Sequence, residues 1–255
     1  RILKSLIILA LFIAPLLISS APVQALSGSE FKSGNIIDDA VFFNRYSMSP
    51  EGIQSFLNSK VPICDTNGSQ ARGGGTRADY GISAGYPPPY TCLKSYSETT
   101  PSKAAEEGLC NGYGGGVRSS AQIIYDVSQS CGINPQVLIV LLQKEQSLIT
   151  DDWPWAIQYR SATGFGCPDT APCDTEYYGF FNQVYAAARQ FKRYSKDSYL
   201  FNFRAQRAAQ IQFNPNAGCG SSSVFIENNA TAGLYNYTPY QPNGAALNNL
   251  YGSGD

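Results

Sequence analysis

Apolar side chains first recur at helical spacing around residue 50. Ser49 is a suitable N-cap and Pro50 suits the first helical position. Because side chains three and four positions apart lie on one side of a helix, the next apolar residues would form a single buried face: Ile53, Phe56 and Leu57. The pattern predicts a short helix, and we expect residues 26–61 to form an N-terminal helical module.

Longer helical patterns follow residue 118. Ser119 or Ser120 can cap a helix that ends near Cys131, and Asn134 is a good N-cap for the next helix. The turn between the two is short, so we expect them to be antiparallel. A third long helix is expected from about Tyr177 to Tyr194, where apolar residues again recur every three or four positions.

The remaining segments lack a clear period. Residues 62–117 are rich in Gly, Ser, Pro and Tyr and fit the period of neither strand nor helix, so they are expected to be long loops held by disulfides. Residues 196–212 would add a helical or irregular segment, and the chain after residue 214 shows little regular pattern. The sequence therefore predicts a mainly α fold, with a helical domain over residues 118–255.

The N-terminus has the features of a secretory signal. Arg1 and Lys4 precede 13 residues of apolar character, positions 6–18, and Val23-Gln24-Ala25 offers small residues where signal peptidase cleaves. This stretch is shorter than the roughly 18 to 20 residues that span a bilayer. We expect residues 1–25 to be a signal peptide and the mature protein to be secreted, associated with the cell wall and without a stable membrane anchor.

The ends of the chain and its net charge lead to two further expectations. The chain begins with Arg rather than Met and ends in Gly-Ser-Gly-Asp, so we expect a fragment that is open at both ends and whose last domain continues beyond Asp255. It has 18 Lys and Arg against 19 Asp and Glu, and residues 1–25 hold two of the cations and no acid, which leaves a net charge of about −3. This near balance gives no indication of nucleic acid as a partner.

Seven cysteines in an exported chain favour disulfides. Their spacing lacks the paired Cys-x-x-Cys motifs of a zinc site. Among the many pairings that the sequence allows, the pairing of sequence neighbours leaves Cys219 for a partner beyond residue 255. The bonds would then be Cys64–Cys92, Cys110–Cys131 and Cys167–Cys173.

The chain contains no histidine. For these residues, that excludes Ser-His-Asp and Cys-His nucleophilic catalysis and His-ligated zinc hydrolysis. Among enzymes that degrade cell walls, zinc amidases and cysteine endopeptidases are excluded, and a secreted protease is disfavoured. Cleavage of a glycosidic bond needs only carboxylates and stays open, with no metal and no organic cofactor.

Glu145 is the candidate for that chemistry. It occupies the last turn of the helix that starts after Asn134, and six consecutive apolar residues, 137–142, predict that this helix is buried all round. A carboxyl group beside leucine side chains is poorly solvated as an anion and can hold a proton near neutral pH, as a general acid requires. Two other interpretations stay open: a surface glutamate at a helix end, or an ion pair with Lys144 or Arg160, although Lys144 points about 100° away around the helix.

Four features follow one another along the chain. A buried helix ends in Glu145, a Gly-rich turn follows at residues 161–166, a Gly-to-Gln element at residues 179–183 and a Tyr-Asn pair at residues 235–236. Their order, over residues 118–240, resembles the lysozyme superfamily, in particular goose-type lysozymes and soluble lytic transglycosylases. The resemblance implies a mostly helical fold whose cleft binds the alternating N-acetylglucosamine and N-acetylmuramic acid of peptidoglycan, cleaved with one glutamate as acid and then base.

The resemblance also implies roles for several side chains. The phenol of Tyr235 would help to orient the acid or the sugar, beside Asn236. From its chemistry alone, the amide of Gln183 could donate to N-acetyl or hydroxyl groups, or Gln183 could equally be a solvated or capping residue. Independently of the family, three aromatic residues follow the helix closely: Trp153, Trp155 and Tyr159. Flat aromatic faces with polar edges suit sugar rings as well as core packing.

The type of reaction depends on a second carboxylate. About 5 Å from the acid it would be a nucleophile, and at about 6.5 to 9.5 Å it would activate water. Without one, an intramolecular attack would give a 1,6-anhydro product, which is the outcome that we favour. The candidates, which could equally be loop or capping residues, are Asp152, Asp169, Asp174 and Glu176.

The sequence therefore predicts a secreted enzyme that cleaves peptidoglycan glycan strands through Glu145. The competing interpretation is a non-catalytic cell-wall-binding or adhesin-like module on a lysozyme-like scaffold. It is favoured by the long loops and by Gln146, which separates the glutamate from a serine that follows the acid directly in the family.

Overall fold

The structure, a computed structural model, describes residues 27–168 and 171–249. The predicted signal peptide at residues 1–25 and the candidate carboxylate Asp169 therefore lie outside the described residues. Among the described helices, none combines the length and the apolar character that a membrane span requires.

The chain divides into two compact units. Of the described residues, the smaller unit contains 27–31 and 244–249, with a 3-10 helix, η1 (Gly28–Glu30), and the helix α9 (Gly244–Asn248). The larger unit, residues 32–243, holds the other described elements. It includes residues from each of the predicted segments 26–61, 62–117 and 118–255.

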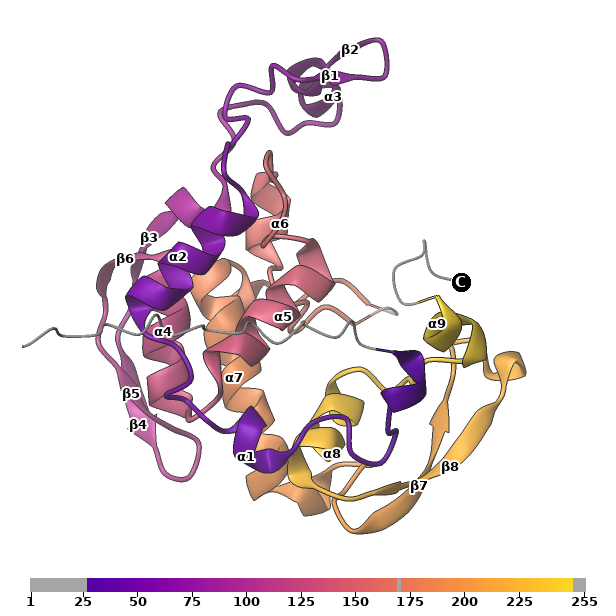
Figure 1. Ribbon diagram of the computed structural model, residues 1–255. Coiled ribbons are helices and arrows are strands. Elements are labelled where there is room, and N and C mark those ends of the chain that lie inside the picture. Colours follow the sequence, from indigo (N-terminus) through magenta and orange to yellow (C-terminus); the bar gives the residue numbers. More distant parts are fainter. Residues whose placement is uncertain (1–26, 169–170, 250–255) are drawn as a thin grey trace, which may run out of the picture. The chain divides into compact units, whose positions relative to one another are not determined.

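The larger unit contains eight α-helices and eight strands among its described residues (Figure 1). Its helices are α1 (Asp39–Phe42), α2 (Pro50–Lys60), α3 (Arg77–Ser83), α4 (Ser120–Cys131), α5 (Pro135–Gln146), α6 (Ala156–Arg160), α7 (Phe180–Lys196) and α8 (Asn229–Tyr237). Its strands are β1 (Ala71–Arg72), β2 (Gly75–Thr76), β3 (Ser97–Thr100), β4 (Lys103–Glu106), β5 (Cys110–Tyr113), β6 (Gly116–Ser119), β7 (Arg207–Gln212) and β8 (Ser221–Ile226). Its 3-10 helices are η2 (Leu93–Ser95), η3 (Thr175–Tyr177), η4 (Ser198–Leu200) and η5 (Ala217–Cys219).

The prediction of a mainly α fold is wrong. Helix takes up 44% and strand 15% of the structure, so the fold is mixed α and β. The strands form four two-stranded antiparallel sheets, β1–β2, β3–β6, β4–β5 and β7–β8. The first six strands begin within residues 62–117 and are only two or four residues long and largely exposed, so they lack the apolar alternation that marks a half-buried strand in a sequence.

The predicted helices near residues 50, 119 and 134 are confirmed. Ser49, Ser119 and Asn134 each accept a backbone N–H bond with the side chain at the start of α2, α4 and α5. The third long helix begins at Phe180 instead of Tyr177, because the residues before it form η3.

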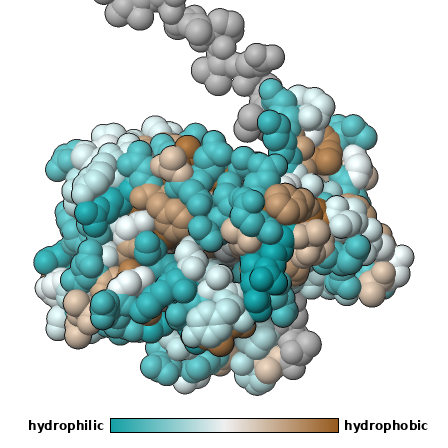
Figure 2. All heavy atoms as spheres, turned by 90° about the horizontal axis from the view of Figure 1, so that it is seen from below, coloured by the Kyte–Doolittle hydropathy of each residue, from teal (hydrophilic) through white to brown (hydrophobic). Residues whose placement is uncertain are grey.

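Helix α7 packs against α4, α6 and α8, and α4 also contacts α2 and α5 (Figure 1). The apolar residues of α7 recur with the helical period, so that Phe180, Val184 and Phe191 are buried together with Leu138 and Leu142 of α5. One apolar core therefore joins these helices. On the face drawn in Figure 2, hydrophilic residues predominate and hydrophobic residues form small separate areas.

A second, smaller core lies between the β7–β8 hairpin and α8. Ile211, Val224 and Ile226 are buried and pack with Tyr235 of α8. The sequence predicted a helical or irregular segment up to residue 212 and little regular structure after it, and both expectations are wrong here. The apolar and polar positions do not alternate regularly, because the exposed Phe225 lies between Val224 and Ile226, so the pattern conceals strands that the antiparallel pairing stabilises.

Residues 62–92 form an excursion from the helices that carries β1, β2 and α3, and we call it the lobe (Figure 1). The disulfide Cys64–Cys92 closes the base of the lobe. The pairing of sequence neighbours is confirmed, since the structure also contains the disulfides Cys110–Cys131 and Cys167–Cys173, and Cys219 is free and exposed. Three disulfides are compatible with an extracytoplasmic location.

Candidate functional site

Glu145 lies in the last turn of α5, where the helix leaves the core. The helix starts at the buried Asn134, whose side chain accepts a bond from the N–H of Gln136. It ends at the exposed Ser147, which adopts the left-handed conformation with a φ of 58°. Because α5 begins inside the core and ends at its surface, it carries the carboxyl group to the boundary between apolar side chains and solvent.

The side chain of Glu145 is 24% exposed and forms an ion pair with Lys144. Nζ of Lys144 lies 2.8 Å from Oε1 of Glu145 and donates to Oγ1 of Thr238 at 3.2 Å. The ion pair considered from the sequence is therefore present, although neighbouring helix positions point about 100° apart. The flexible lysine side chain reaches around the helix, and the contact ties the end of α5 to the residue that follows α8.

The other carboxylate oxygen, Oε2, faces the Gly-rich turn. Gly164 comes so close that a Cβ at this position would lie 3.0 Å from Oε2, and its φ of 70° is one that L side chains rarely adopt. Tyr237 of α8 borders the same turn, where its hydroxyl donates to the carbonyl oxygen of Thr163 at 2.8 Å. Burial raises the pKa of Tyr237, and the charge of Glu145 adds to this rise. The Tyr237 hydroxyl therefore keeps its proton in the neutral range.

Gln183, on α7, holds the same turn from inside the core. Its side chain is fully buried. Oε1 accepts bonds from the N–H groups of Thr163 and Phe165, each at 3.1 Å, and Nε2 donates to the carbonyl oxygens of Phe165 and Tyr177, each at 2.8 Å. Two N–H donors face one end of the amide and two carbonyls face the other, which fixes its orientation. These bonds make Gln183 a positioning residue for the segment that contains Gly164.

Tyr235 and Asn236 are engaged elsewhere on α8. The ring of Tyr235 is 1% exposed, its hydroxyl donates to the carbonyl oxygen of Ser33 at 2.9 Å, and burial raises its pKa to about 12. The amide of Asn236 forms two hydrogen bonds with the backbone of Phe203. Both side chains anchor α8, and it is the next residue, Tyr237, that contacts the turn facing Glu145.

Trp153 and Tyr159 connect the segment after α5 to the lobe. The ring of Trp153 packs edge-on against Tyr90, with centroids 5.7 Å apart, and the Arg77 guanidinium lies 5.1 Å from its centre. Tyr159 is buried and donates its hydroxyl to the carbonyl oxygen of Thr91 at 2.6 Å. Trp153 and Tyr159 thus both contact residues of the lobe.

The candidate second carboxylates Asp174 and Glu176 lie at η3. Asp174 caps this element by accepting a bond from the N–H of Glu176 at 3.0 Å, and the side chain of Glu176 is exposed. Both acids therefore belong to the 3-10 turn that precedes α7 and not to that helix.

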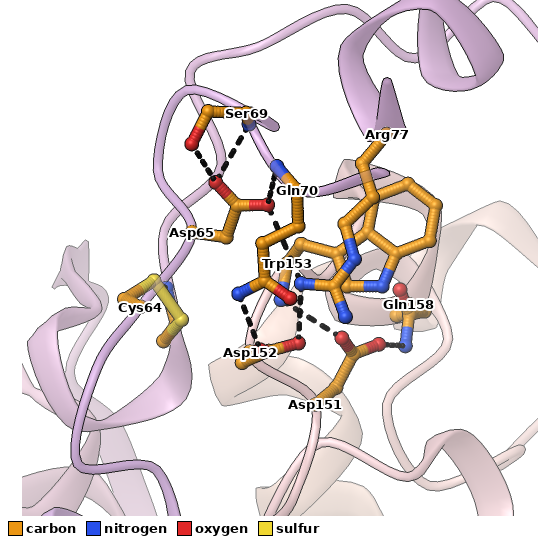
Figure 3. A network of polar contacts seen from close by, with 10 residues as sticks. Cys64, Asp65, Ser69, Gln70, Arg77, Asp151, Asp152, Trp153 and Gln158 are labelled. Carbon is orange, nitrogen blue, oxygen red and sulfur yellow. Dashed lines mark hydrogen bonds and ion pairs between the residues drawn. A yellow bond between two sulfur atoms is a disulfide. The ribbon is translucent and has the colours of Figure 1, made fainter. Parts of the chain in front are cut away.

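The remaining described candidate, Asp152, belongs to an ion-pair network at the base of the lobe (Figure 3). Nη1 of Arg77 lies 2.9 Å from Asp152 and 3.3 Å from the buried Asp65. Burial alone raises the pKa of Asp65, but hydrogen bonds from the backbone of Gln70 and Ser69, from the Ser69 hydroxyl and from Arg77 outweigh it and lower that pKa. The network joins the lobe to the segment between α5 and α6.

Tyr237 is the residue beside Glu145 that the sequence reasoning did not select. On a helix, residues 235 and 237 point about 200° apart. Once Tyr235 faces the β7–β8 hairpin, Tyr237 must face α7, where its ring stacks on Phe191 at 4.9 Å. The Tyr-Asn-Tyr spacing predicts that the two tyrosines face opposite sides of the helix. Which of them faces α7 can be predicted only when the β7–β8 hairpin is known.

Among the described residues, no group of three or more Cys, Asp and Glu side chains is arranged to hold a metal ion. Comparisons of the chain with protein-family models, with curated proteins and with solved structures found no match. The assignment of a function therefore rests on the residues and on their geometry.

Proposed function

We propose that this protein is a secreted enzyme that cleaves the glycan strands of peptidoglycan, with Glu145 as its single general acid and base. One observation supports this most: a partly buried carboxyl group at the end of a core helix, next to a glycine whose missing side chain leaves room beside Oε2. A glycosidic oxygen needs a proton from a carboxylic acid in such partly apolar surroundings.

The chemistry requires Glu145 to act twice. The carboxylic acid donates a proton to the leaving glycosidic oxygen as the bond to C1 breaks, and the carboxylate then accepts a proton from the nucleophile. Asp152 is paired with Arg77 and Asp174 caps η3, so both have structural partners. This favours the sugar's own 6-hydroxyl as the nucleophile, with a 1,6-anhydro product.

The two neighbours of the carboxyl group have distinct parts in this proposal. The Tyr237 hydroxyl bonds to Thr163 and fixes the turn at one wall of the site. The Lys144 side chain is 54% exposed and can swing away from Glu145. Because a cation disfavours the protonated carboxyl group, we expect bound glycan to displace Lys144 before the acid step.

The test uses the oxidised protein from residue 26 onward, its Glu145→Gln variant and, as a matched control, Glu107→Gln at an exposed glutamate. Each is incubated with purified peptidoglycan, and the released muropeptides are identified by mass spectrometry. Anhydro-muropeptides are expected from the unmodified protein and from the control, and none from Glu145→Gln.

Other products would change the proposal in defined ways. Reducing-end products that depend on Glu145 would mean hydrolysis and would direct attention to Asp169, Asp174 and Glu176 as the second carboxylate. No release by any of the proteins between pH 4 and pH 9, with sedimentation onto the cell wall intact, would reject the enzyme.

The second candidate function is a non-catalytic module that binds the cell wall. The observation in its favour is the ion pair of Glu145 with Lys144, which, through Thr238, gives the glutamate a structural role at the junction of α5 and α8. Under this alternative, Glu145→Gln lowers stability and leaves the amount of bound protein unchanged.

A further inference from the structure

A groove lies between the lobe, β3 and α6. It has a volume of about 760 Å³, within the range of about 300 to 1,000 Å³ that is usual for sites of small ligands. Glu145 is not among the residues that line it. We call it the aromatic groove, after its lining rings: Tyr86, Tyr90, Tyr96, Trp155, Tyr159 and Tyr178.

The walls of the aromatic groove are fixed by bonds that do not involve a ligand. Tyr159 donates its hydroxyl to Thr91 of the lobe at 2.6 Å, and its ring stacks on Tyr96 with centroids 4.2 Å apart. The Arg77 network and the disulfide Cys64–Cys92 hold the base of the lobe. A preformed groove loses little conformational freedom when a ligand binds.

The chemistry of the lining is amphipathic. Its large apolar faces come from Tyr, Trp and Pro, and no Leu, Ile, Val or Phe is among the described residues that line it. Tyr86 and Trp155 are both half-buried and stack on each other at 4.7 Å. Flat rings with hydroxyl or N–H edges match a pyranose ring, which has an apolar C–H face and a rim of hydroxyl groups.

Among the described residues that line the groove, one carries a charged side chain, Arg160. Arg160 is exposed, and its guanidinium lies 4.8 Å from the ring centre of Tyr178. The ion pairs found among the described residues do not include it. A guanidinium supported on an aromatic face presents a fork of donors that suits a carboxylate.

We propose that the aromatic groove binds a carbohydrate chain that carries a carboxylate, with a pyranose ring against Tyr86 and Trp155 and the carboxylate on Arg160. The carboxylate belongs either to a peptide-free N-acetylmuramic acid or to a hexuronic acid. The inference goes beyond glycan cleavage, because it concerns a site without Glu145 and holds whether or not that residue is catalytic.

A proline-rich peptide is the other ligand that aromatic grooves commonly bind. Two observations favour the sugar. Pro87 and Pro89 of the lobe already line the groove, and an uncharged proline-rich segment would leave Arg160 without a partner. The acidic carbohydrate uses both the rings and the charge.

The test is a titration followed by tryptophan fluorescence and calorimetry. The two tryptophans of the chain, Trp153 and Trp155, lie at the groove or next to it, so their emission reports on it. Four ligands are compared: a peptide-free tetrasaccharide of alternating N-acetylglucosamine and N-acetylmuramic acid, tetragalacturonate, neutral chitotetraose and a proline-rich decapeptide. Measurements with Glu145→Gln avoid turnover and are repeated with the unmodified protein at short times.

The variants are Tyr86→Ala and Arg160→Gln, with Tyr199→Ala and Arg207→Gln as controls at an exposed tyrosine and an exposed arginine outside the groove. One of the acidic ligands should bind about tenfold more tightly than chitotetraose. Arg160→Gln should remove this difference in affinity. Tyr86→Ala should lower the affinity for both the acidic ligand and chitotetraose by about tenfold. The controls should leave the affinities unchanged.

Each contrary result overturns a stated part of the proposal. Equal affinity for acidic and neutral sugars, unchanged by Arg160→Gln, overturns the carboxylate, and binding of the decapeptide alone overturns the carbohydrate. Binding by the unmodified protein that Glu145→Gln loses would place the ligand at Glu145 instead of the groove. If near-ultraviolet circular dichroism shows that Tyr86→Ala is misfolded, the exposed Arg160→Gln decides. Absence of muropeptide release would reject the proposed enzyme and leave this inference intact.

Discussion

Gln183 and Thr163 bond to each other inside the core, directly behind the turn that faces Glu145. Oε1 of Gln183 lies 3.1 Å from both the backbone nitrogen and Oγ1 of Thr163, and Oγ1 of Thr163 lies 3.0 Å from the carbonyl oxygen of Gln183. Both side chains are fully buried. The position of Gly164 is therefore set by the core and not by solvent-exposed contacts.

Replacing Gln183 by leucine should destabilise the protein strongly. The substitution leaves the N–H groups of Thr163 and Phe165 and two carbonyl oxygens without partners, so we expect a loss of about 3 kcal/mol in the free energy of unfolding. Urea unfolding measures it. The same replacement at the exposed Gln136 is the control and should stay within about 0.5 kcal/mol. A loss at Gln183 no larger than at Gln136 would contradict the positioning role.

Replacing Gly164 by alanine should lower the rate of muropeptide release far more than a strained glycine replacement elsewhere does. The new Cβ would lie 3.0 Å from Oε2 of Glu145, and we expect muropeptide release to fall by about 100-fold or more because the carboxyl group must move. Gly73 is the matched control, since it also has a positive φ but a Cβ there meets nothing within 4 Å. Gly73→Ala should cost about 1 kcal/mol of stability and leave the rate unchanged. Equal rates for both variants would rule out Gly164 as part of the site.

Replacing Ser147 by glycine should stabilise the protein. Ser147 ends α5 with a φ of 58°, a conformation that glycine adopts without the steric cost of a side chain. We expect a gain of about 1 kcal/mol in the free energy of unfolding, measured by thermal or urea denaturation. Ser147→Ala keeps the Cβ and should bring no gain, and equal effects of the two substitutions would show that φ is not the cause.

Asp65 should make stability depend on pH in the acid range. Its folded-state pKa is lowered from 3.8, so the carboxylate stabilises the fold fully above pH 4 or so, and this contribution is lost as the pH falls through the lowered folded-state value. Asp65→Asn should therefore be about 2 kcal/mol less stable than the unmodified protein at pH 7. The difference should shrink below pH 4, as urea unfolding at a series of pH values would show. A difference independent of pH would mean that packing, not charge, is lost.

The sequence predicted the helices better than the site because their signals are local. Asn134 and Pro135 fix the start of α5, and the place of Glu145 in its last turn follows by counting. The partners of Glu145 are not local. Tyr237 contacts the turn that faces Glu145 only because α8 packs between the hairpin and α7, which no helical period reveals.

The short strands were not predicted from the sequence for a related reason. Strand β3 pairs with β6, from Ser97↔Ser119 to Thr100↔Gly116, although the residues involved are mostly polar and exposed. Such pairing depends on contacts across the sheet and not on an apolar face that the sequence could reveal. An alternation of apolar residues is absent because the strands have little core to cover.

Because its two ends lie close together, the lobe can be replaced without changing the rest of the fold. The Cα atoms of Cys64 and Cys92 are 5.9 Å apart, a gap that one or two residues can bridge, since consecutive Cα atoms lie about 3.8 Å apart. The lobe can therefore be cut out and a dipeptide, or a lobe of another sequence, grafted between the same two points. One wall of the aromatic groove would be exchanged in this way while α4, α5 and α7 keep their mutual packing, so ligand preference could diversify on a constant scaffold.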